Sequence, residues 1–310
     1  MKETDRMAIY HSIDEYLPDG RGCRAALGFF DGVHLGHRAV IAGSADMGLR
    51  SVVLTFAQSP SKALGAPFQG LITDNRRKAE LLTQAGAEDI IFADFGALRD
   101  MSAEDFVGKI LVEKLRAKRV CCGFNYRFGK GGEGDVKRLI ELCSKYGIDV
   151  EAREPVTVDG EQVSSSRIRE LIASGDIKRA NKMLGYRYAI SGDIAGGNHL
   201  GTGMGFPTVN IPIGGELIVP RYGVYASKVT VGGREYIGAT NIGVHPTVGE
   251  NDKPLCESFL LDFGGGDLYG SYAVCELCDF VRDERVFGSF DELKAQIDAD
   301  CERIKGIMTE

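Results

Sequence analysis

Residues 28–37 read GFFDGVHLGH, and this stretch decides the fold of the first half of the chain. The run 25–30 is apolar enough to form a buried strand, and residues 38–47 favour a helix. A glycine-bearing turn between a strand and a helix presents backbone N–H groups and the helix dipole to an anion. Two imidazoles at that turn, those of His34 and His37, can neutralise a phosphate. The first hypothesis is therefore nucleotide chemistry.

The remaining residues of this turn have expected roles of their own. Asp31 and Gly32 are expected to shape the turn, and Gly36 to let a nucleotide approach the backbone. If a nucleotidyl group is transferred here, the nucleophile is a phosphate that is already ionised near neutral pH, so no general base is needed. The protein then has to align the groups and stabilise charge. The alternative is that a histidine here only caps the helix.

Composition limits the class of protein. The chain has 310 residues and 44% hydrophobic content, which favours two domains with full cores. The net charge of −7 argues against a nucleic-acid partner and leaves small phosphorylated substrates open. No apolar run is long enough to cross a membrane, and the start, MKETDR, lacks a signal peptide's apolar core. We expect a cytoplasmic protein without a membrane partner, in which the eight cysteines are free thiols.

The first half alternates strands and helices. Strands are expected at 24–30, 51–56, 89–92 and 119–123, and helices near 75–85, 102–115 and 135–146. This alternation predicts an α/β domain in which helices cover a parallel sheet. Ligands of such sheets gather at the carboxyl ends of the strands. The double-histidine turn follows the first predicted strand, so it lies at that edge.

The second half has a different pattern. From residue 188 onward short strands dominate, including 224–231 and 234–242 around a Gly232-Gly233 turn. Further strands are expected at 257–263 and 271–281, and a final helix opens at Ser289 with Glu292 three residues later. We expect a small antiparallel β-barrel with a C-terminal helix. The domains are predicted to be 1–185 and 186–310, joined near Gly185. Whether the chain forms a homo-oligomer is left open.

Two more clusters in the first half suit a nucleotide. Residues 123–132 read GFNYRFGKGG after a predicted strand, where an amide can bind a base or phosphate and a cation can meet negative charge. Residues 164–169 read SSSRIR and offer hydroxyl and guanidinium groups at a helix start. The alternatives are a mobile connector, an N-cap serine and a solvated arginine. The candidate binding residues are Asn125, Arg127, Ser165, Ser166 and Arg169.

The second half offers a different chemistry. Residues 201–211 read GTGMGFPTVNI, and on a strand Thr208 and Asn210 point to the same side. A hydroxyl and an amide oxygen there suit Mg²⁺ and phosphate, and the preceding glycines, including Gly203, can wrap the phosphates of ATP. Glu257, expected to begin a strand, can accept a proton from a substrate hydroxyl. Another loop that can line the pocket contains Asn241, Gly243, Pro246 and Thr247.

These second-half residues also have simpler interpretations. Thr208 and Asn210 can be an ordinary turn-and-strand pair, and Glu257 a solvated edge residue. Cys275 and Cys278 have zinc-like spacing, but residues three apart on a strand face opposite sides, so a shared metal is not expected.

Taken together, the motifs resemble the bacterial bifunctional riboflavin kinase/FAD synthetase family over nearly the whole chain. The resemblance rests on FDGVHLGH (30–37), SSSRIRELIASGD (164–176), GFPTVNI (205–211), NIGVHPTVG (241–249) and ESFLLDF (257–263). It implies a Rossmann-like nucleotidyltransferase domain followed by a kinase barrel. The barrel would phosphorylate riboflavin with ATP to give FMN, the first domain would transfer AMP to FMN to give FAD, and Mg²⁺ would serve both reactions.

The resemblance also implies roles for single residues. In the first domain, His34 and His37 would contact the phosphates of the adenylyl donor. Thr208 and Asn210 would bind the magnesium nucleotide, and Glu257 would activate the ribityl 5′-hydroxyl. Asn125, Ser165, Ser166 and Arg169 would help to bind nucleotide in the first domain. Further candidates for nucleotide binding there are Phe30, Gly32, Gly36 and Arg127.

Two other functions stay open at this point. One is a nucleotidyltransferase with another acceptor, such as phosphopantetheine, which leaves the second half unexplained. The other is a riboflavin kinase whose first half is a weak or non-catalytic flavin-binding module. Its support is Ser59, which stands where the family usually has a histidine.

Overall fold

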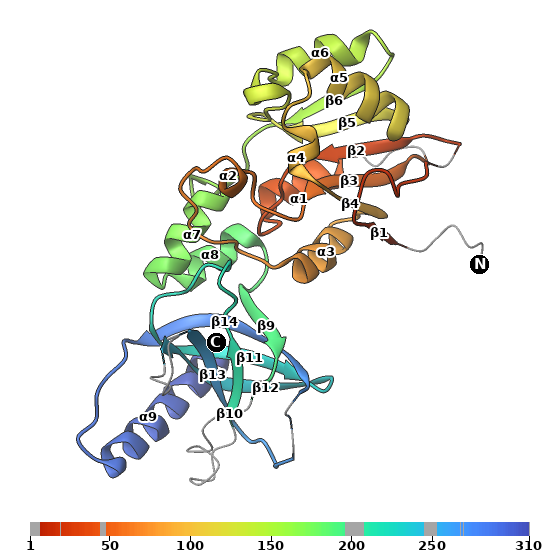
Figure 1. Cartoon of the computed structure of the whole chain (residues 1–310). Coiled ribbons are helices and arrows are strands. Elements are labelled where there is room, and N and C mark those ends of the chain that lie inside the picture. Colours follow the sequence, from red (N-terminus) through yellow and green to blue (C-terminus); the bar gives the residue numbers. More distant parts are fainter. Residues whose placement is uncertain are drawn as a thin grey trace. The chain divides into compact units, whose positions relative to one another are not determined.

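The computed structural model describes residues 7–18, 20–43, 48–195, 208–244, 253–266, 268 and 270–309. The chain forms two compact units, one ending at Ser165 and one beginning at Ser166 (Figure 1). The prediction that the domains join near Gly185 stays a prediction. Gly185 ends a helix in the left-handed conformation, at φ 75°.

The first unit contains a six-stranded parallel sheet, which confirms the predicted class. The four predicted strands are present, with ends shifted by up to three residues, and two more strands extend the edges. In spatial order the strands are β1 (Ala8–Tyr10), β4 (Asp89–Ala93), β3 (Arg50–Phe56), β2 (Cys23–Leu27), β5 (Ala117–Gly123) and β6 (Asp149–Arg153).

Capping residues set the helix bounds of this unit. The helix expected over 38–47 is α1 (Leu35–Ala42): it begins earlier because His34 caps it, and ends earlier because Gly43 has φ 51°. Asp74 and Asp135 cap α3 (Asn75–Gln84) and α6 (Val136–Ser144) as N-cap residues. The short elements are α2 (Pro60–Ala63), α4 (Phe95–Leu98), η3 (Lys130–Gly132), β7 (Thr157–Val158) and β8 (Glu161–Gln162).

The helix expected over 102–115 differs from its prediction. Ser102 caps a single α-turn, α5 (Ala103–Asp105), and the chain then continues as a π-helix, η2 (Phe106–Lys114). Together with α6, this helix covers one face of the sheet. The shared core includes Leu27, Leu54, Val107, Leu111, Val120, Leu139 and Leu142.

The second unit is a nearly closed antiparallel barrel of six strands, as predicted. Ala195 N–H donates to the Asn210 carbonyl at 2.9 Å and brings the two edge strands together. The Gly232-Gly233 turn has φ 58° and 75°, which suits a tight hairpin. The strands, in spatial order, are β10 (Thr208–Pro212), β13 (Pro254–Leu260), β12 (Arg234–Val244), β11 (Gly223–Val231), β14 (Tyr272–Arg282) and β9 (Ala189–Asp193).

Three helices accompany the barrel. These are α7 (Ser165–Ser174), α8 (Ile177–Leu184) and α9 (Phe290–Thr309). Asn181 of α8 donates from Nδ2 to the Leu277 carbonyl at 2.9 Å. The Ser289 hydroxyl and the Glu292 carboxylate cap the start of α9 reciprocally, which confirms the predicted start. The helix then packs Ile304 against Val224 and Val281 on the outside of the barrel.

Alternation along the strands separates the inside of the barrel from its outer face. On β13, Cys256, Ser258 and Leu260 are buried, whereas Glu257 and Phe259 between them are half-buried. On β14, Cys275 is fully buried and contacts the hydroxyls of the barrel interior, whereas Cys278 is partly exposed. The two cysteines thus lie on different faces of their strand, as period-two geometry requires.

Candidate active sites

The double-histidine turn lies where β2 ends and α1 begins. His34 is 6% exposed and is the N-cap of α1, since its Nδ1 accepts the His37 backbone N–H at 3.2 Å. The rings of His34 and His37 stack, with centroids 3.5 Å apart and planes 16° apart. Phe30 meets the His37 ring edge-on at 5.3 Å. The structure therefore shows the capping role for His34, and its role in a site stays a prediction.

This cap limits what His34 can do. A nitrogen that accepts a backbone N–H bears no proton, so the neutral ring carries its proton on Nε2. In this tautomer, Nε2–H is the hydrogen-bond donor that the His34 ring offers. The prediction that both imidazoles neutralise a phosphate stays a prediction. Protonation of His34 at Nδ1 would break the cap of α1.

The backbone of the turn is strained. Phe30 and Val33 have φ 53° and 37°, a left-handed conformation that side-chain-bearing residues rarely adopt. Such residues cost on the order of 1–3 kcal/mol each and occur at functional sites. Asp31, 2% exposed, holds the turn, because its carboxylate accepts the backbone N–H groups of Ile72 (2.9 Å) and Thr73 (3.3 Å).

The two glycines of the turn make room for neighbouring side chains. A Cβ on Gly32 would lie 2.9 Å from Ile72 Cδ1, and φ at Gly32 is 78°. A Cβ on Gly36 would lie 3.2 Å from the His34 ring. Gly36 therefore creates the space in which the His34 imidazole lies, an explanation that the sequence did not suggest.

The structure brings two of the other predicted clusters to this edge of the sheet. Asn125 and Arg127 are exposed on the loop after β5, which is the strand next to β2. Ser165 donates from Oγ to the Asp31 carbonyl at 3.0 Å and so contacts the turn directly. Ser166 and Arg169 follow in α7 as part of the second unit, and their binding role stays a prediction.

Sequence reasoning missed Lys78. Its side chain is 2% exposed in α3, donates from Nζ to the Phe56 carbonyl at 3.0 Å and lies 4.2 Å from the Phe29 ring centroid. Burial lowers the pKa of Lys78 to about 7, and nearby Asp31 opposes this shift. The ammonium thus contacts the last residue of β3 and the segment that follows β2, although a lysine inside a helical pattern looks like a surface residue.

The second site is a row of polar side chains across the barrel. Strand register pairs Glu257 of β13 with Asn210 of β10 on one side and with Asn241 of β12 on the other. Directly paired residues point to the same face, with Cβ atoms about 4.5–5.5 Å apart. The predicted base and the predicted metal-binding amide are therefore neighbours on the outer face. Glu257 lies in the middle of β13, which corrects the expectation that it begins the strand.

Thr208 and Asn210 also meet as predicted. The Asn210 amide Nδ2 lies 3.5 Å from Thr208 Oγ1, and the Asn210 side chain is 5% exposed. A hydroxyl and an amide carbonyl are the hard oxygen ligands that Mg²⁺ uses beside water and phosphate oxygens. The residues present therefore fit Mg²⁺. Gly203 and the rest of its glycine-rich loop lie outside the described residues, as do Pro246 and Thr247. Asn241 and Gly243, expected in a loop, lie on strand β12.

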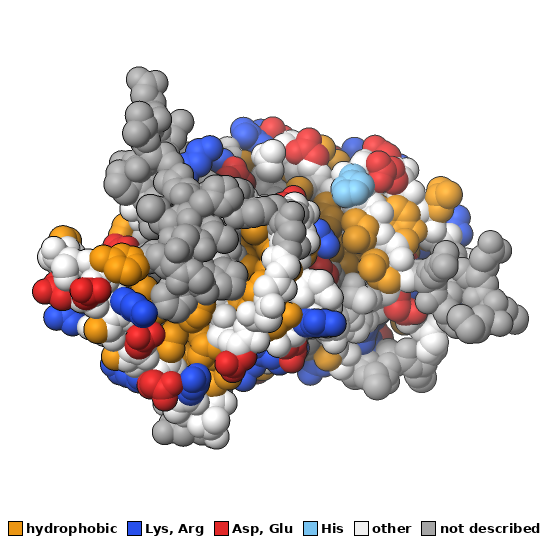
Figure 2. Space-filling view, turned by 90° about the horizontal axis from the view of Figure 1, so that it is seen from below, with side chains coloured by type: hydrophobic (Ala, Val, Ile, Leu, Met, Phe, Trp, Pro, Cys, Tyr) orange, Lys and Arg blue, Asp and Glu red, His pale blue; other side chains and the backbone are white. Residues whose placement is uncertain are grey.

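The surface carries charged side chains of both signs (Figure 2). Figure 2 shows acidic and basic side chains interspersed on the face that it draws, with exposed hydrophobic side chains between them. Among the described residues, none of the helices has the length and apolar character needed to span a membrane.

Comparison with known proteins covers both units. A family model described as FAD synthetase matches residues 17–167, and one described as riboflavin kinase matches residues 184–308. The chain is 35% identical over 288 residues to the bifunctional riboflavin kinase/FMN adenylyltransferase of Escherichia coli K12, covering 90% of each chain. It is 33% identical to the Pseudomonas fluorescens protein of the same name, covering 95% of this chain and 96% of that one.

A solved structure shares the whole fold. It is described as a macrolide-efflux protein from Streptococcus pneumoniae and matches with a TM-score of 0.84 and 27% identity, covering 96% of this chain and 99% of that chain. The arrangement of a parallel sheet followed by a barrel is therefore found elsewhere as one continuous chain.

Proposed function

Since the chain belongs to the bifunctional riboflavin kinase/FMN adenylyltransferase family, we propose how its two sites divide two reactions. The chain is a transferase that phosphorylates riboflavin with ATP to give FMN and then adenylylates FMN to give FAD and pyrophosphate. The single observation that supports this division of the two reactions is the difference in side-chain chemistry between the two sites. The barrel site contains a carboxylate beside two amides, whereas the turn after β2 contains imidazoles and backbone N–H groups.

Adenylyl transfer is assigned to the first unit. An oxygen of the FMN phosphate attacks the α-phosphorus of ATP, and the bond to pyrophosphate breaks. The nucleophile is already ionised, so the protein's task is to align it and to stabilise the charge that builds on the α-phosphate. His34 donates from Nε2, and the N-terminus of α1 contributes its N–H groups and dipole. Asp31 holds the strained turn in place.

Riboflavin phosphorylation is assigned to the second unit. A neutral alcohol is a poor nucleophile, so a base has to remove its proton as the oxygen attacks the γ-phosphorus and ADP leaves. Glu257 is the carboxylate in the row with Asn210 and Asn241, and we assign it the role of base. Asn210 and Thr208 would hold the nucleotide together with Mg²⁺, which would neutralise charge on the phosphate oxygens.

The reaction conditions are part of the proposal. Both reactions use ATP and Mg²⁺, and riboflavin and FMN are the acceptors. The eight cysteines are free thiols, seven of them buried, which suits a reducing cytoplasm.

Matched variants test this division. Glu257→Gln keeps the shape of the side chain and removes its basicity, so FMN formation should fall at least a hundredfold while FAD formation from supplied FMN persists. His34→Asn keeps an N-cap acceptor but lacks the Nε2–H donor, so FAD formation should fall at least tenfold while FMN formation persists. Chromatography of the flavin products measures both activities in one incubation.

The capping role of His34 needs its own control. His34→Ala removes the cap as well as the donor and should destabilise the first unit by about 1 kcal/mol, whereas His34→Asn should not. If either Glu257→Gln or His34→Asn lost both activities while remaining folded, the assignment of the reactions to separate sites would be wrong.

A further inference from the structure

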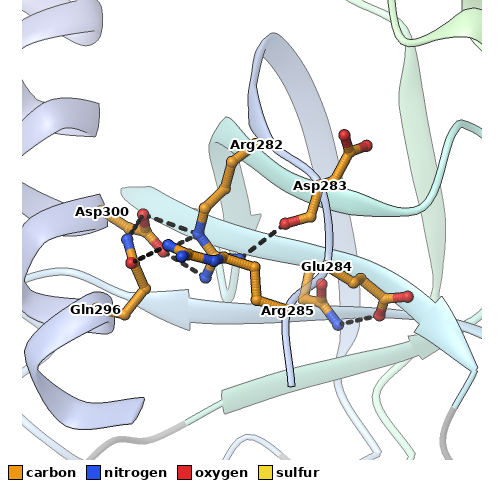
Figure 3. A network of polar contacts seen from close by, with 7 residues as sticks. Arg282, Asp283, Glu284, Arg285, Gln296 and Asp300 are labelled. Atoms are coloured by element: carbon orange, nitrogen blue, oxygen red, sulfur yellow. Dashed lines mark hydrogen bonds and ion pairs between the residues drawn. The ribbon is translucent and has the colours of Figure 1, made fainter. Parts of the chain in front are cut away.

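A second carboxylate, that of Glu284, reaches the row that contains Glu257. Glu284 lies two residues beyond the end of β14 (Figure 3). Its Oε1 accepts a hydrogen bond from Asn241 Nδ2 at 3.3 Å. Asn241 is in turn the register partner of Glu257. Asn241 therefore stands between the proposed base and a residue that no motif in the sequence points to.

The outer face of β12 is shaped for this carboxylate. A Cβ on Gly243, two residues after Asn241 and on the same face, would lie 2.1 Å from Glu284 Oε1. Because φ at Gly243 is not in the left-handed region, the backbone itself does not require glycine there. The missing side chain leaves the space that the Glu284 carboxylate fills.

The segment that carries Glu284 is anchored to α9. Arg282 donates from Nε and Nη2 to the Asp300 carboxylate at 2.7–3.1 Å, and Asp300 is 5% exposed. Gln296 donates to the same carboxylate at 2.9 Å and accepts from Arg285 Nη1 at 3.0 Å (Figure 3). Contacts to ionised groups are among the stronger hydrogen bonds. Residues on both sides of Glu284 are thus held in place.

We propose that Glu284 is a positioning residue for riboflavin phosphorylation, which acts by fixing the orientation of the Asn241 side-chain amide. An ionised carboxylate only accepts hydrogen bonds, so it requires the NH₂ group of Asn241 to face it. The Asn241 carbonyl oxygen Oδ1 then points away from Glu284, where it can accept a hydrogen bond. Without the carboxylate, the amide has two orientations of similar energy.

This orientation matters for a substrate that carries hydroxyl groups. The ribityl chain of riboflavin is a row of O–H donors, and its terminal hydroxyl has to lie beside Glu257 for proton transfer. With its orientation fixed, Asn241 Oδ1 is an acceptor one strand away from Glu257. By binding a ribityl hydroxyl, it would place the terminal hydroxyl of riboflavin beside the base. The inference rests on the proposed role of Glu257, and it predicts an effect on the riboflavin KM rather than on the ATP KM.

The first test compares two neighbouring isosteric substitutions in the full chain. Glu284→Gln can present its own NH₂ group to Asn241 and so permits the reversed amide, whereas Asp283→Asn changes a carboxylate that contacts Arg221 instead. Glu284→Gln should raise the riboflavin KM about tenfold, with the ATP KM within twofold of the wild-type value. Asp283→Asn should leave both values within twofold. Titration of riboflavin by its fluorescence, with ADP and Mg²⁺ present, should show the same loss of affinity.

A second variant moves the carboxylate without removing it. Gly243→Ala should displace Glu284 from Asn241 at unchanged net charge, and so raise the riboflavin KM to a similar degree. In the Asn241→Ala background, Glu284→Gln should have no further effect, because the residue through which it acts is gone. FAD formation from supplied FMN should be unchanged in all of these variants.

The outcomes separate this inference from the proposed function. A riboflavin KM for Glu284→Gln within twofold of the wild type overturns the positioning role, and so does an equal rise in Asp283→Asn. A Glu284→Gln effect that persists at full size in the Asn241→Ala background also overturns it. Full FMN formation by Glu257→Gln overturns the proposed site itself, whatever Glu284→Gln does.

Discussion

At the scale of single residues, the first unit contains a buried base that helix patterning does not reveal. Lys78 donates to the Phe56 carbonyl and lies over the Phe29 ring, so its ammonium joins the ends of two strands. The same placement removes it from water, and burial lowers its pKa to about 7. Its charge is therefore a cost to folding that depends on pH.

The sign of this dependence follows from proton counting. Between pH 7 and about 10 the unfolded chain binds more protons at Lys78 than the folded chain, so the free energy of unfolding rises with pH. The free energy of unfolding of the wild type, relative to that of Lys78→Met, should rise by about 1 kcal/mol between pH 8 and pH 9. Amide hydrogen exchange in β3 measures the difference. For the control Lys137→Met, at an exposed position of α6, the difference in the free energy of unfolding from the wild type should not change with pH. If the difference for Lys78→Met did not change with pH either, the prediction would be contradicted.

At the scale of elements, side chains settle what the pattern of the sequence leaves open. Strand–helix alternation and the Gly232-Gly233 turn were enough to predict both architectures, because these are local properties of the chain. The π-helix η2, the strand order of the sheet and the burial of Lys78 depend on contacts between distant residues. The same holds for the row of Asn210, Glu257 and Asn241, since register across strands is not visible along one strand.

The interior of the barrel illustrates such a distant contact. Fully buried hydroxyls from three strands form a chain, in which Thr240 Oγ1 lies 2.6 Å from Ser227 Oγ and 2.8 Å from Ser258 Oγ. Each strand alone shows only a polar residue at an inward position. Polar side chains that point into a core destabilise it unless they form hydrogen bonds with one another.

Removing the middle hydroxyl tests this chain. Thr240→Val keeps the shape of the side chain but leaves two buried hydroxyls without their shared partner, so the second unit should lose about 1–3 kcal/mol of stability. Thr230→Val on the partly exposed face of β11 should change it by less than about 0.5 kcal/mol. Urea unfolding monitored in the second unit provides the comparison. Equal losses for both variants would show that the hydroxyl chain does not stabilise the barrel.

At the scale of the whole molecule, each reaction has its own unit and its own core. The described parts of the barrel site, Thr208, Asn210, Asn241 and Glu257, all belong to the second unit, and the turn around His34 belongs to the first. FMN is the product of one site and the acceptor of the other. The division implies that FMN can leave one molecule and react on another.

Mixing two full-length variants, each impaired in a different reaction, tests this implication. Glu257→Gln alone should form little FMN, and His34→Asn alone should form FMN but little FAD. An equimolar mixture should convert riboflavin to FAD faster than either variant, because FMN released by His34→Asn can react in the first unit of Glu257→Gln. The rate should rise with the concentration of both proteins. Should the mixture form FMN and no FAD, although each variant retains its remaining activity, transfer within one molecule would be required.

The left-handed backbone at Phe30 and Val33 has a consequence for laboratory evolution. A residue that is costly in this conformation can be exchanged for glycine or asparagine with a gain in heat resistance, since those residues adopt it more readily. Selection for survival at high temperature alone would therefore favour relaxed versions of this segment. Such variants would hold the proposed anion-binding turn less rigidly. Directed evolution for thermostability is therefore expected to lower the rate of FAD formation.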